Sequence, residues 1–222
     1  AKVVDRKERL EEVINRKKKR GESVTDLNNE LKAVNKVANF LTPVTKLVLT
    51  ESANKITYDS LQIHGGTGYM KEFRVERLAR DARITNIYEG TSQLQVVAAI
   101  SGVLNDVLKE YFDKREKKEY AGGLAVLSNH LKEIREILYD SLKYVAGKKD
   151  TGFQDVAAKE LVELYAYLYV GYLLLDEAEE NQKKRFIANR YILNALASSR
   201  KNAEIIKSET YSDILHLDEI VK

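Results

Sequence analysis

Apolar residues recur at intervals of three and four along most of the chain. One such stripe comprises Leu27, Leu31, Val34, Val37, Ala38 and Leu41. This spacing brings side chains onto one face of a helix. No stretch alternates with the period of two that a half-buried strand needs, and Pro43 is the single proline in 222 residues. The pattern therefore predicts an all-α fold.

The first predicted helix ends in a basic block, RKKKR at residues 16–20, which Gly21 follows. Blocks of this kind occur in nuclear-targeting and nucleic-acid-binding segments. We favour a simpler interpretation, because basic side chains in the last turn offset the negative end of the helix dipole and a glycine often comes next.

A second helical pattern begins at Ser23 and contains the proline of the chain. At Thr42 and Pro43 the sequence predicts one of two structures: a kink in one helix, or the end of a helix and the start of another. The apolar pattern resumes after Pro43 and ends at the residues His-Gly-Gly, 64–66.

Further helical segments fill the rest of the chain. The first half continues with residues 75–82 and 91–108. The apolar stripe of the latter comprises Leu94, Val97, Ala98, Val103, Leu104 and Leu108. After Gly122 and Gly123 come residues 124–145, 153–175 and 186–206, with Gly147 and Gly152 between the first two, and a short last segment with Ile214, Leu217 and Val221. We expect an up-and-down helical bundle over residues 1–120 and a second small helical bundle over residues 121–222.

The composition excludes several classes of function. The 37 basic and 34 acidic residues give a net charge of only +3, so nucleic acid is not an expected partner. The chain has no cysteine, which excludes disulfides and thiolate chemistry. His64, His130 and His216 lie far apart, so we expect no metal site.

The longest apolar run, residues 161–175, contains one charge and four tyrosines. It is shorter than the roughly 20 apolar residues that cross a bilayer, so it predicts a core helix and no transmembrane segment. The first residues are charged and do not form a signal peptide. We expect a soluble, cytoplasmic protein.

The start of the chain suggests a piece of a longer protein. The sequence begins at Ala1, its only methionine is Met70, and a helical pattern is already running at the first residues. We therefore expect that part of any active site precedes Ala1.

Two short motifs carry the candidate chemistry. IYEGTSQ, residues 87–93, places an acid between an aromatic residue and a glycine, which by itself fits a loop whose hydroxyls cap a helix. QIHGGTGYM, residues 62–70, fits a helix end and a tight turn, for which one or two glycines suffice. Its third glycine raises the alternative of a backbone that approaches a ligand closely.

Together, these motifs make residues 61–100 similar to the C-terminal signature of the acyl-CoA dehydrogenase family. The order and spacing of the following residues resemble those of the family: Gln62, Gly65-Gly66, Gly68-Tyr69, Arg80-Asp81 and Tyr88-Glu89-Gly90-Thr91. The resemblance is close from Val44 to Val103 and thins over the last hundred residues, where the chain resembles members with an added C-terminal helical extension.

The resemblance implies a role for each matching residue. Glu89 is implied to be the base that removes the α-proton of an acyl-CoA thioester, with Tyr88 and Gly90 against the substrate. Contacts with FAD are implied for Thr91, Ser92 and Gln93, and for Gln62, Ile63, His64, Gly65 and Gly66, which reach the FAD of a neighbouring subunit. An electron-transfer flavoprotein as acceptor and a homodimer or homotetramer are also implied.

Elementary chemistry agrees with this assignment. The α-hydrogen of a thioester is a weak acid, so a carboxylate must lie within bonding reach of it. We expect Glu89 in an apolar, water-poor pocket beside Tyr88, where burial disfavours the charged carboxylate.

The resemblance also implies an N-terminal helical domain and a central β-domain that are absent from this sequence. We therefore expect the fragment alone to be inactive. Two alternatives stay open: an acyl-CoA oxidase with the same base, and a helical oligomerisation or interaction module without catalysis. The acyl chain length cannot be read from these residues.

Overall fold

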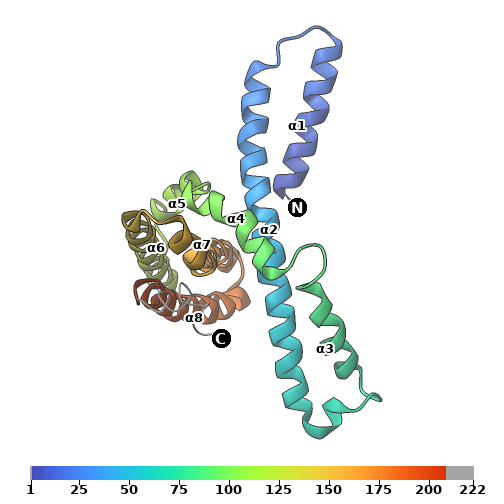
Figure 1. The fold of residues 1–222 in the computed structure, drawn as a ribbon. Coiled ribbons are helices and arrows are strands. Elements are labelled where there is room, and N and C mark those ends of the chain that lie inside the picture. Colours follow the sequence, from blue (N-terminus) through green and yellow to red (C-terminus); the bar gives the residue numbers. More distant parts are fainter. Residues whose placement is uncertain (1, 209–222) are drawn as a thin grey trace. The chain divides into compact units, whose positions relative to one another are not determined.

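The computed structural model describes residues 2–208 (Figure 1). Every element within this range is a helix, which confirms the all-α prediction. The chain divides into two compact units between Val107 and Leu108. The expected last segment with Ile214, Leu217 and Val221, together with His216, lies outside the described residues.

Unit 1 begins with two antiparallel helices, α1 (Lys2–Lys19) and the N-terminal half of α2 (Thr25–His64) (Figure 1). The basic block occupies the last turn of α1, as the helix dipole favours. Gly21 follows with a left-handed φ of 71°, and the amide of Glu22 donates to the carbonyl of Lys17 at 3.1 Å. The prediction that this block ends a helix is confirmed.

Helix α2 runs as one element of 40 residues through the buried Pro43. The alternative in which one helix ends here and another begins is therefore wrong. Proline has no N–H, so the carbonyl of Asn39 lacks its usual donor. One residue earlier, the Thr42 hydroxyl donates to the carbonyl of Ala38 at 2.9 Å.

Three shorter elements lie against α2: the 3-10 helix η1 (Gly65–Tyr69), α3 (Arg74–Thr85) and α4 (Ser92–Leu104). The Asn54 side chain donates to the carbonyl of Ala82 at 3.0 Å and so ties α3 to α2. Helix α4 approaches most closely at Gly102, where an added Cβ would lie 2.4 Å from Cδ2 of Phe40.

Helix α4 differs from the prediction in length and in its buried face. It ends at Leu104, where Asp106 takes a φ of 44°, and does not reach Leu108. Leu94 is 57% exposed and Val97 59% exposed within the described residues. The buried residues of α4 are Val96, Ala99 and Val103, of which Val103 was predicted. Both faces of this helix are apolar, so periodicity alone placed Leu94 and Val97 on the wrong face.

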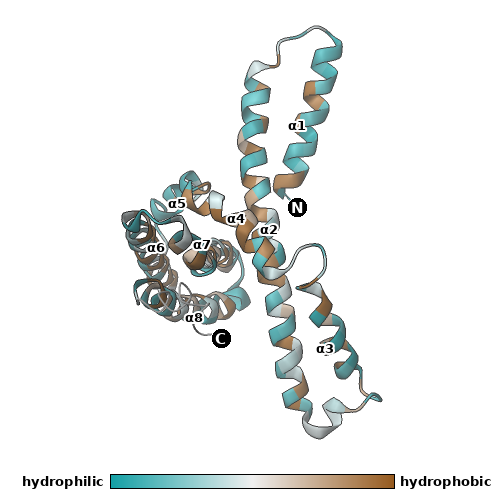
Figure 2. Cartoon of the chain, viewed as in Figure 1, coloured by the Kyte–Doolittle hydropathy of each residue, from teal (hydrophilic) through white to brown (hydrophobic). Residues whose placement is uncertain are grey.

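Unit 2 contains α5 (Lys109–Glu116), α6 (Gly123–Lys148), α7 (Thr151–Glu180) and α8 (Gln182–Lys207). Helices α6, α7 and α8 pack against one another, which confirms the expected second bundle, and their apolar faces meet inside it (Figure 2). The turn from α6 to α7 uses Lys149 in a left-handed conformation, with φ of 53°. Gly147 and Gly152, expected between the helices, lie inside them.

The apolar run at residues 161–175 forms the middle of α7. Tyr165 and Tyr172 are fully buried there, and the Tyr165 hydroxyl accepts the amide of Leu108 at 2.8 Å. The interpretation of this run as core is confirmed. Among the described residues, no helix has the length and apolarity that a membrane crossing needs.

Helix α5 belongs to unit 2, although residues 108–120 were expected in the first bundle. The cause is Arg135 on α6, which is 5% exposed. Its guanidinium bonds the carboxylates of Asp113 at 2.6 Å and Glu116 at 2.9 Å, both on α5. A buried cation needs such partners, so α5 packs where they neutralise it.

Asp113 makes the stability of the folded chain depend on pH. Hydrogen bonds from Lys109 and Arg135 hold the pKa of its carboxyl below its usual value near 4. A lowered folded-state pKa contributes stability above the unfolded pKa, and this is lost as pH falls through the folded value. We expect Asp113→Asn to lower the unfolding temperature at pH 7 and to flatten its further fall below about pH 4. Exposed Asp155→Asn should match the parent chain in thermal scans at each pH.

The contact between Gly102 and Phe40 gives a second prediction. Gly102→Ala should lower the free energy of unfolding by about 1 kcal/mol or more, because overpacking outweighs the better helix propensity of alanine. Gly147→Ala is the control, since its added Cβ has nothing within 4 Å, and it should raise stability by about 0.5–1 kcal/mol. Urea titrations followed by circular dichroism measure both; equal shifts of the same sign would contradict the packing argument.

Candidate functional site

The turn between α3 and α4 carries the candidate base. The amides of Ile87 and Tyr88 donate to the carbonyl of Ile84, at 3.0 and 3.1 Å. The amide of Ser92 donates back to the carbonyl of Asn86 at 3.2 Å and closes the turn. These bonds place residues 88–90 at its tip.

Three successive carbonyls at the tip are held by side chains from two helices. Lys46, on α2, donates to the carbonyl of Tyr88 and, at 2.5 Å, to that of Gly90. Gln95, on α4, donates to the carbonyls of Glu89 at 3.3 Å and Gly90 at 3.1 Å. The backbone of the tip is therefore anchored on its inner side.

Glu89 is held in an unusual backbone conformation. Its φ of 52° is left-handed, which costs a residue with a Cβ about 1–2 kcal/mol. The side chain is exposed and forms no ion pair or hydrogen bond with the residues between 2 and 208. These residues therefore do not form the expected water-poor pocket around Glu89, and half of the neighbouring Tyr88 is also exposed.

The hydroxyl residues after the tip serve the fold of the turn. Thr91 caps α4, and its Oγ1 accepts the amide of Leu94 at 3.4 Å. The Ser92 hydroxyl donates to Glu51 on α2, which also accepts the side-chain amide of Asn86 at 3.1 Å. Of the predicted cofactor residues here, Ser92 is thus engaged within the chain, while Gln93 is exposed.

The second predicted cofactor segment lies at the C-terminal end of α2. Gln62, Ile63 and His64 form its last turn and Gly65 and Gly66 begin η1, all of them exposed. The structure does not bring this segment to the Glu89 turn. Gln62 follows Glu51 by eleven residues of helix, which at about 1.5 Å per residue is roughly 16 Å.

The third glycine of this motif, Gly68, is explained by packing. An added Cβ would lie 2.8 Å from both the carbonyl oxygen of Leu61 and the Cβ of His64. Close approach of the chain to itself requires this glycine, so it gives no support for a ligand.

Sequence reasoning missed the residues that hold the turn: Lys46, Glu51 and Gln95. A signal exists for Lys46, since Lys46, Thr50 and Asn54 follow one another at intervals of four on α2. This polar row interrupts an apolar helix on the side where the α3–α4 turn binds. Its meaning depends on the partner segment, which lies about forty residues further along.

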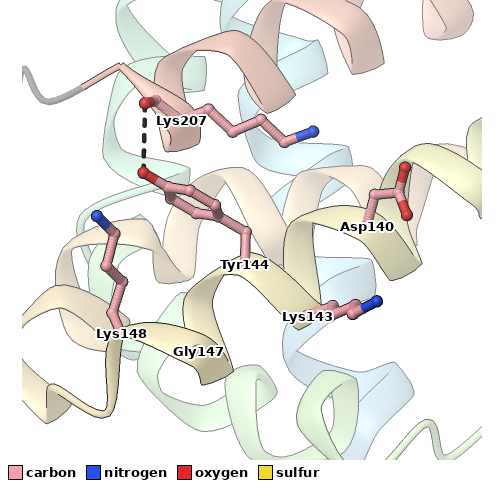
Figure 3. Close-up of a pocket in the computed structure, with 6 residues that line it drawn as sticks. All are labelled: Asp140, Lys143, Tyr144, Gly147, Lys148 and Lys207. Carbon is pink, nitrogen blue, oxygen red and sulfur yellow. Dashed lines mark hydrogen bonds between the residues drawn. The ribbon is translucent and has the colours of Figure 1, made fainter.

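Unit 2 has a separate hollow at the C-terminal ends of α6 and α8 (Figure 3). It is lined by Asp140, Lys143, Tyr144, Gly147, Lys148 and Lys207. The Tyr144 hydroxyl donates to the carbonyl of Lys207 at 3.5 Å, and Nζ of Lys148 lies 4.9 Å from the Tyr144 ring centre. Lysines at helix C-termini stabilise the last carbonyls, so we assign this cluster a structural role.

Comparison with family models covers most of the chain. Residues 27–103 match the model described as acyl-CoA dehydrogenase, C-terminal domain. Residues 101–214 match the model described as acyl-CoA dehydrogenase C terminal. The family similarity, which is less evident in the sequence after Val103, therefore continues into the second unit.

Individual relatives match over parts of their length. A 3-(aryl)acrylate reductase of Clostridium sporogenes is 49% identical over 61 residues, 28% of this chain and 16% of the relative. Acyl-CoA dehydrogenase family member 11 of Caenorhabditis elegans is 30% identical over 168 residues, 68% of this chain and 27% of the relative. The chain thus spans less than a third of each relative.

A solved structure supports the fold. The crystal structure of an acyl-CoA dehydrogenase complexed with FAD from Bacillus anthracis aligns with a TM-score of 0.62 and 19% identity. The alignment covers 74% of this chain and 32% of that protein.

Two glycines with a positive φ, Gly90 in the turn and Gly65 at the end of α2, should lose different amounts of folding stability when changed to alanine. Gly90 has a φ of 92°, and an added Cβ would lie 2.7 Å from Nε2 of Gln95. Gly65 also has a positive φ, of 60°, but nothing within 4 Å. We expect Gly65→Ala to cost about 1 kcal/mol and Gly90→Ala roughly 1 kcal/mol more, because it also breaks the Gln95 bonds. Urea unfolding of the two variants measures the difference; equal costs would show that Gln95 contributes nothing.

Proposed function

Since the chain belongs to the acyl-CoA dehydrogenase family, we propose that it is the C-terminal part of an FAD-dependent enzyme acting on acyl-CoA thioesters. In this proposal Glu89 removes the α-proton, a hydride leaves the β-carbon, and the product is a trans-2-enoyl-CoA. The observation that carries the proposal is the Glu89 carboxylate itself, which projects unpaired from a turn whose backbone is anchored.

The geometry suits a base. A carboxylate that accepts a proton must not be committed to a cation or donor in its own chain, and Glu89 has none among residues 2–208. The fixed carbonyls of Tyr88 and Gly90 restrict the direction of the side chain. Preorganisation of this kind keeps a reacting group near its productive position. In the whole enzyme, the water-poor surroundings would come from substrate, cofactor and other domains.

The residues proposed to hold FAD have suitable chemistry. Gln62 and Gln93 are exposed amides, and Gly65 and Gly66 leave open space where side chains would otherwise stand. In the first turn of α4, the Ser92 amide is bonded to Asn86 and the Leu94 amide to Thr91, which leaves the Gln93 amide for a ligand. When bound, FAD supplies the acceptor for the hydride. The roughly 16 Å along α2 between the two segments is consistent with contacts to the FAD of two subunits.

The proposal extends to partners. Acyl-CoA would lie against Tyr88 and Gly90, where the missing side chain permits close approach. An electron-transfer flavoprotein as electron acceptor and a homodimer or homotetramer belong to the same proposal and follow from the family resemblance. A cytoplasmic location is proposed as well.

A second candidate is the reverse reaction, reduction of an enoyl-type substrate. The similarity to the 3-(aryl)acrylate reductase over 61 residues favours it. The same residue would then return a proton to the α-carbon, because the base of one direction is the acid of the other. Assays of the full-length protein in both directions separate the two candidates.

The proposal predicts the effect of Glu89→Gln in the full-length flavoprotein. The amide has the same size but does not take up the proton, so the rate of flavin reduction by acyl-CoA should fall by about a thousandfold or more. FAD content should be unchanged. Anaerobic stopped-flow spectroscopy at the flavin absorbance band measures both, with a series of saturated acyl-CoA chain lengths.

Glu72→Gln is the matched control, since Glu72 is also exposed in unit 1 and lies outside the turn. In this variant, acyl-CoA should reduce the flavin at the rate found for the parent protein. Normal turnover by Glu89→Gln would remove the assignment of the base, and a parent protein that neither binds FAD nor reacts with any acyl-CoA would favour an interaction module.

A further inference from the structure

We propose that Lys46 is a positioning residue for Glu89, and that its ammonium group sets the backbone conformation from which the carboxylate projects. This inference rests on the proposed function of Glu89. It adds a residue of α2 to the site, 43 positions before the base in the sequence.

The first step is that the conformation of Glu89 needs a cause. A glutamate prefers a negative φ, and the local sequence offers glycine only at the next position, Gly90. The positive φ of 52° therefore persists because contacts outside residues 88–90 impose it.

The second step is that Lys46 is placed to impose it. Its Nζ bonds the carbonyls of Tyr88 and Gly90, the residues on either side of Glu89. Nζ also lies 5.4 Å from the centre of the Tyr88 ring. One cation thus joins the peptide group before Glu89 to the peptide group after Gly90. The backbone between these two bonds contains the two positive φ angles of the tip, 52° at Glu89 and 92° at Gly90.

The third step is that, among the described residues, Lys46 is the side chain that joins the carbonyls of Tyr88 and Gly90. Gln95 reaches the carbonyls of Glu89 and Gly90, and Glu51 reaches Asn86 and Ser92 at the ends of the turn. Within residues 2–208, Lys46 is the side chain that holds the Tyr88 carbonyl.

The fourth step is that Lys46 has a fixed position on α2 and no carboxylate partner in the described range. It is half-buried, between the buried residues Val44 and Leu47 of a long helix. It forms no ion pair with a carboxylate in the described range. A lysine that bonds only carbonyls of one turn has its main effect on the shape of that turn.

The test compares variants of the full-length FAD-bound protein. Lys46→Met keeps the length of the side chain and removes the donors, while Lys46→Arg keeps two N–H donors for the two carbonyls. The matched control is Lys55→Met, because Lys55 is an exposed lysine of the same helix that pairs only with Asp59, at 3.4 Å.

We expect Lys46→Met to lower the maximal rate of flavin reduction by acyl-CoA by about 10- to 100-fold, because displacement of a catalytic group by an ångström has effects of this size. KM and FAD content should stay within about twofold, since uniform binding is not changed. Lys46→Arg should recover most of the rate, and Lys55→Met should equal the parent protein. If Lys46 served only the fold, Lys46→Met would alter FAD content and stability. It would not lower kcat while leaving KM unchanged.

Amide hydrogen exchange gives a readout that does not depend on activity. Loss of the Lys46 clamp should speed exchange of the Ser92 amide, which bonds the Asn86 carbonyl across the turn. Amides of α3 should exchange at the parent rate. Unchanged exchange at Ser92 in Lys46→Met overturns the proposal.

Unchanged flavin reduction in Lys46→Met also overturns it. If that variant fails to keep FAD, Lys46→Gln, which retains one donor, replaces it; loss of FAD in both would assign Lys46 to folding and reject the positioning role. A parent protein that no acyl-CoA reduces defeats the proposed function instead, and the exchange comparison still tests the clamp.

Discussion

Unit 1 depends on the uninterrupted helical backbone of α2. The helices α1, α3 and α4 pack on this one element, and its side chains Lys46, Glu51 and Asn54 bind the backbone or side chains of the segments that follow. A helix of 40 residues gives these side chains fixed relative positions. The absence of an N–H at Pro43 removes one bond of the ladder without ending it, since the surrounding apolar residues are buried. The candidate base is therefore positioned by side chains of α2 and α4 together with the backbone bonds of its own turn.

Unit 2 is stabilised in a different way. Its three long helices bury continuous apolar faces, with Tyr165 and Tyr172 among the largest fully buried side chains. Polar contacts add direction to this packing. Tyr165 accepts the Leu108 amide, and Asp176 accepts two bonds from Arg115 on α5, at 2.9 and 2.6 Å. Such bonds specify where the short α5 lies, which apolar packing alone would not do.

The sequence predicts the features that depend on local patterns. It does not predict those that depend on contact with a distant segment of the chain. Helix class, the end of α1 at its basic block and the three long helices of unit 2 follow from periodicity, capping and glycine. The register of α4 does not, because Val96 and Val97 are equally apolar and only contact with α2 selects one of them. The candidate base Glu89 is proposed from a motif, whereas Lys46 lies 43 residues away and bonds backbone carbonyls, which no residue pattern records.

The buried Arg135 bears on how this fold can change in evolution. Its guanidinium is neutralised by two carboxylates of α5, across the glycines at 122 and 123. Suppose that segments of two related genes were exchanged at these glycines, which separate α5 from α6. Recombination there would join a buried cation to an α5 without its acids, and an uncompensated charge of that kind costs several kcal/mol. Helices α5 and α6 should therefore be inherited as a pair, and their residues at 113, 116 and 135 should change together.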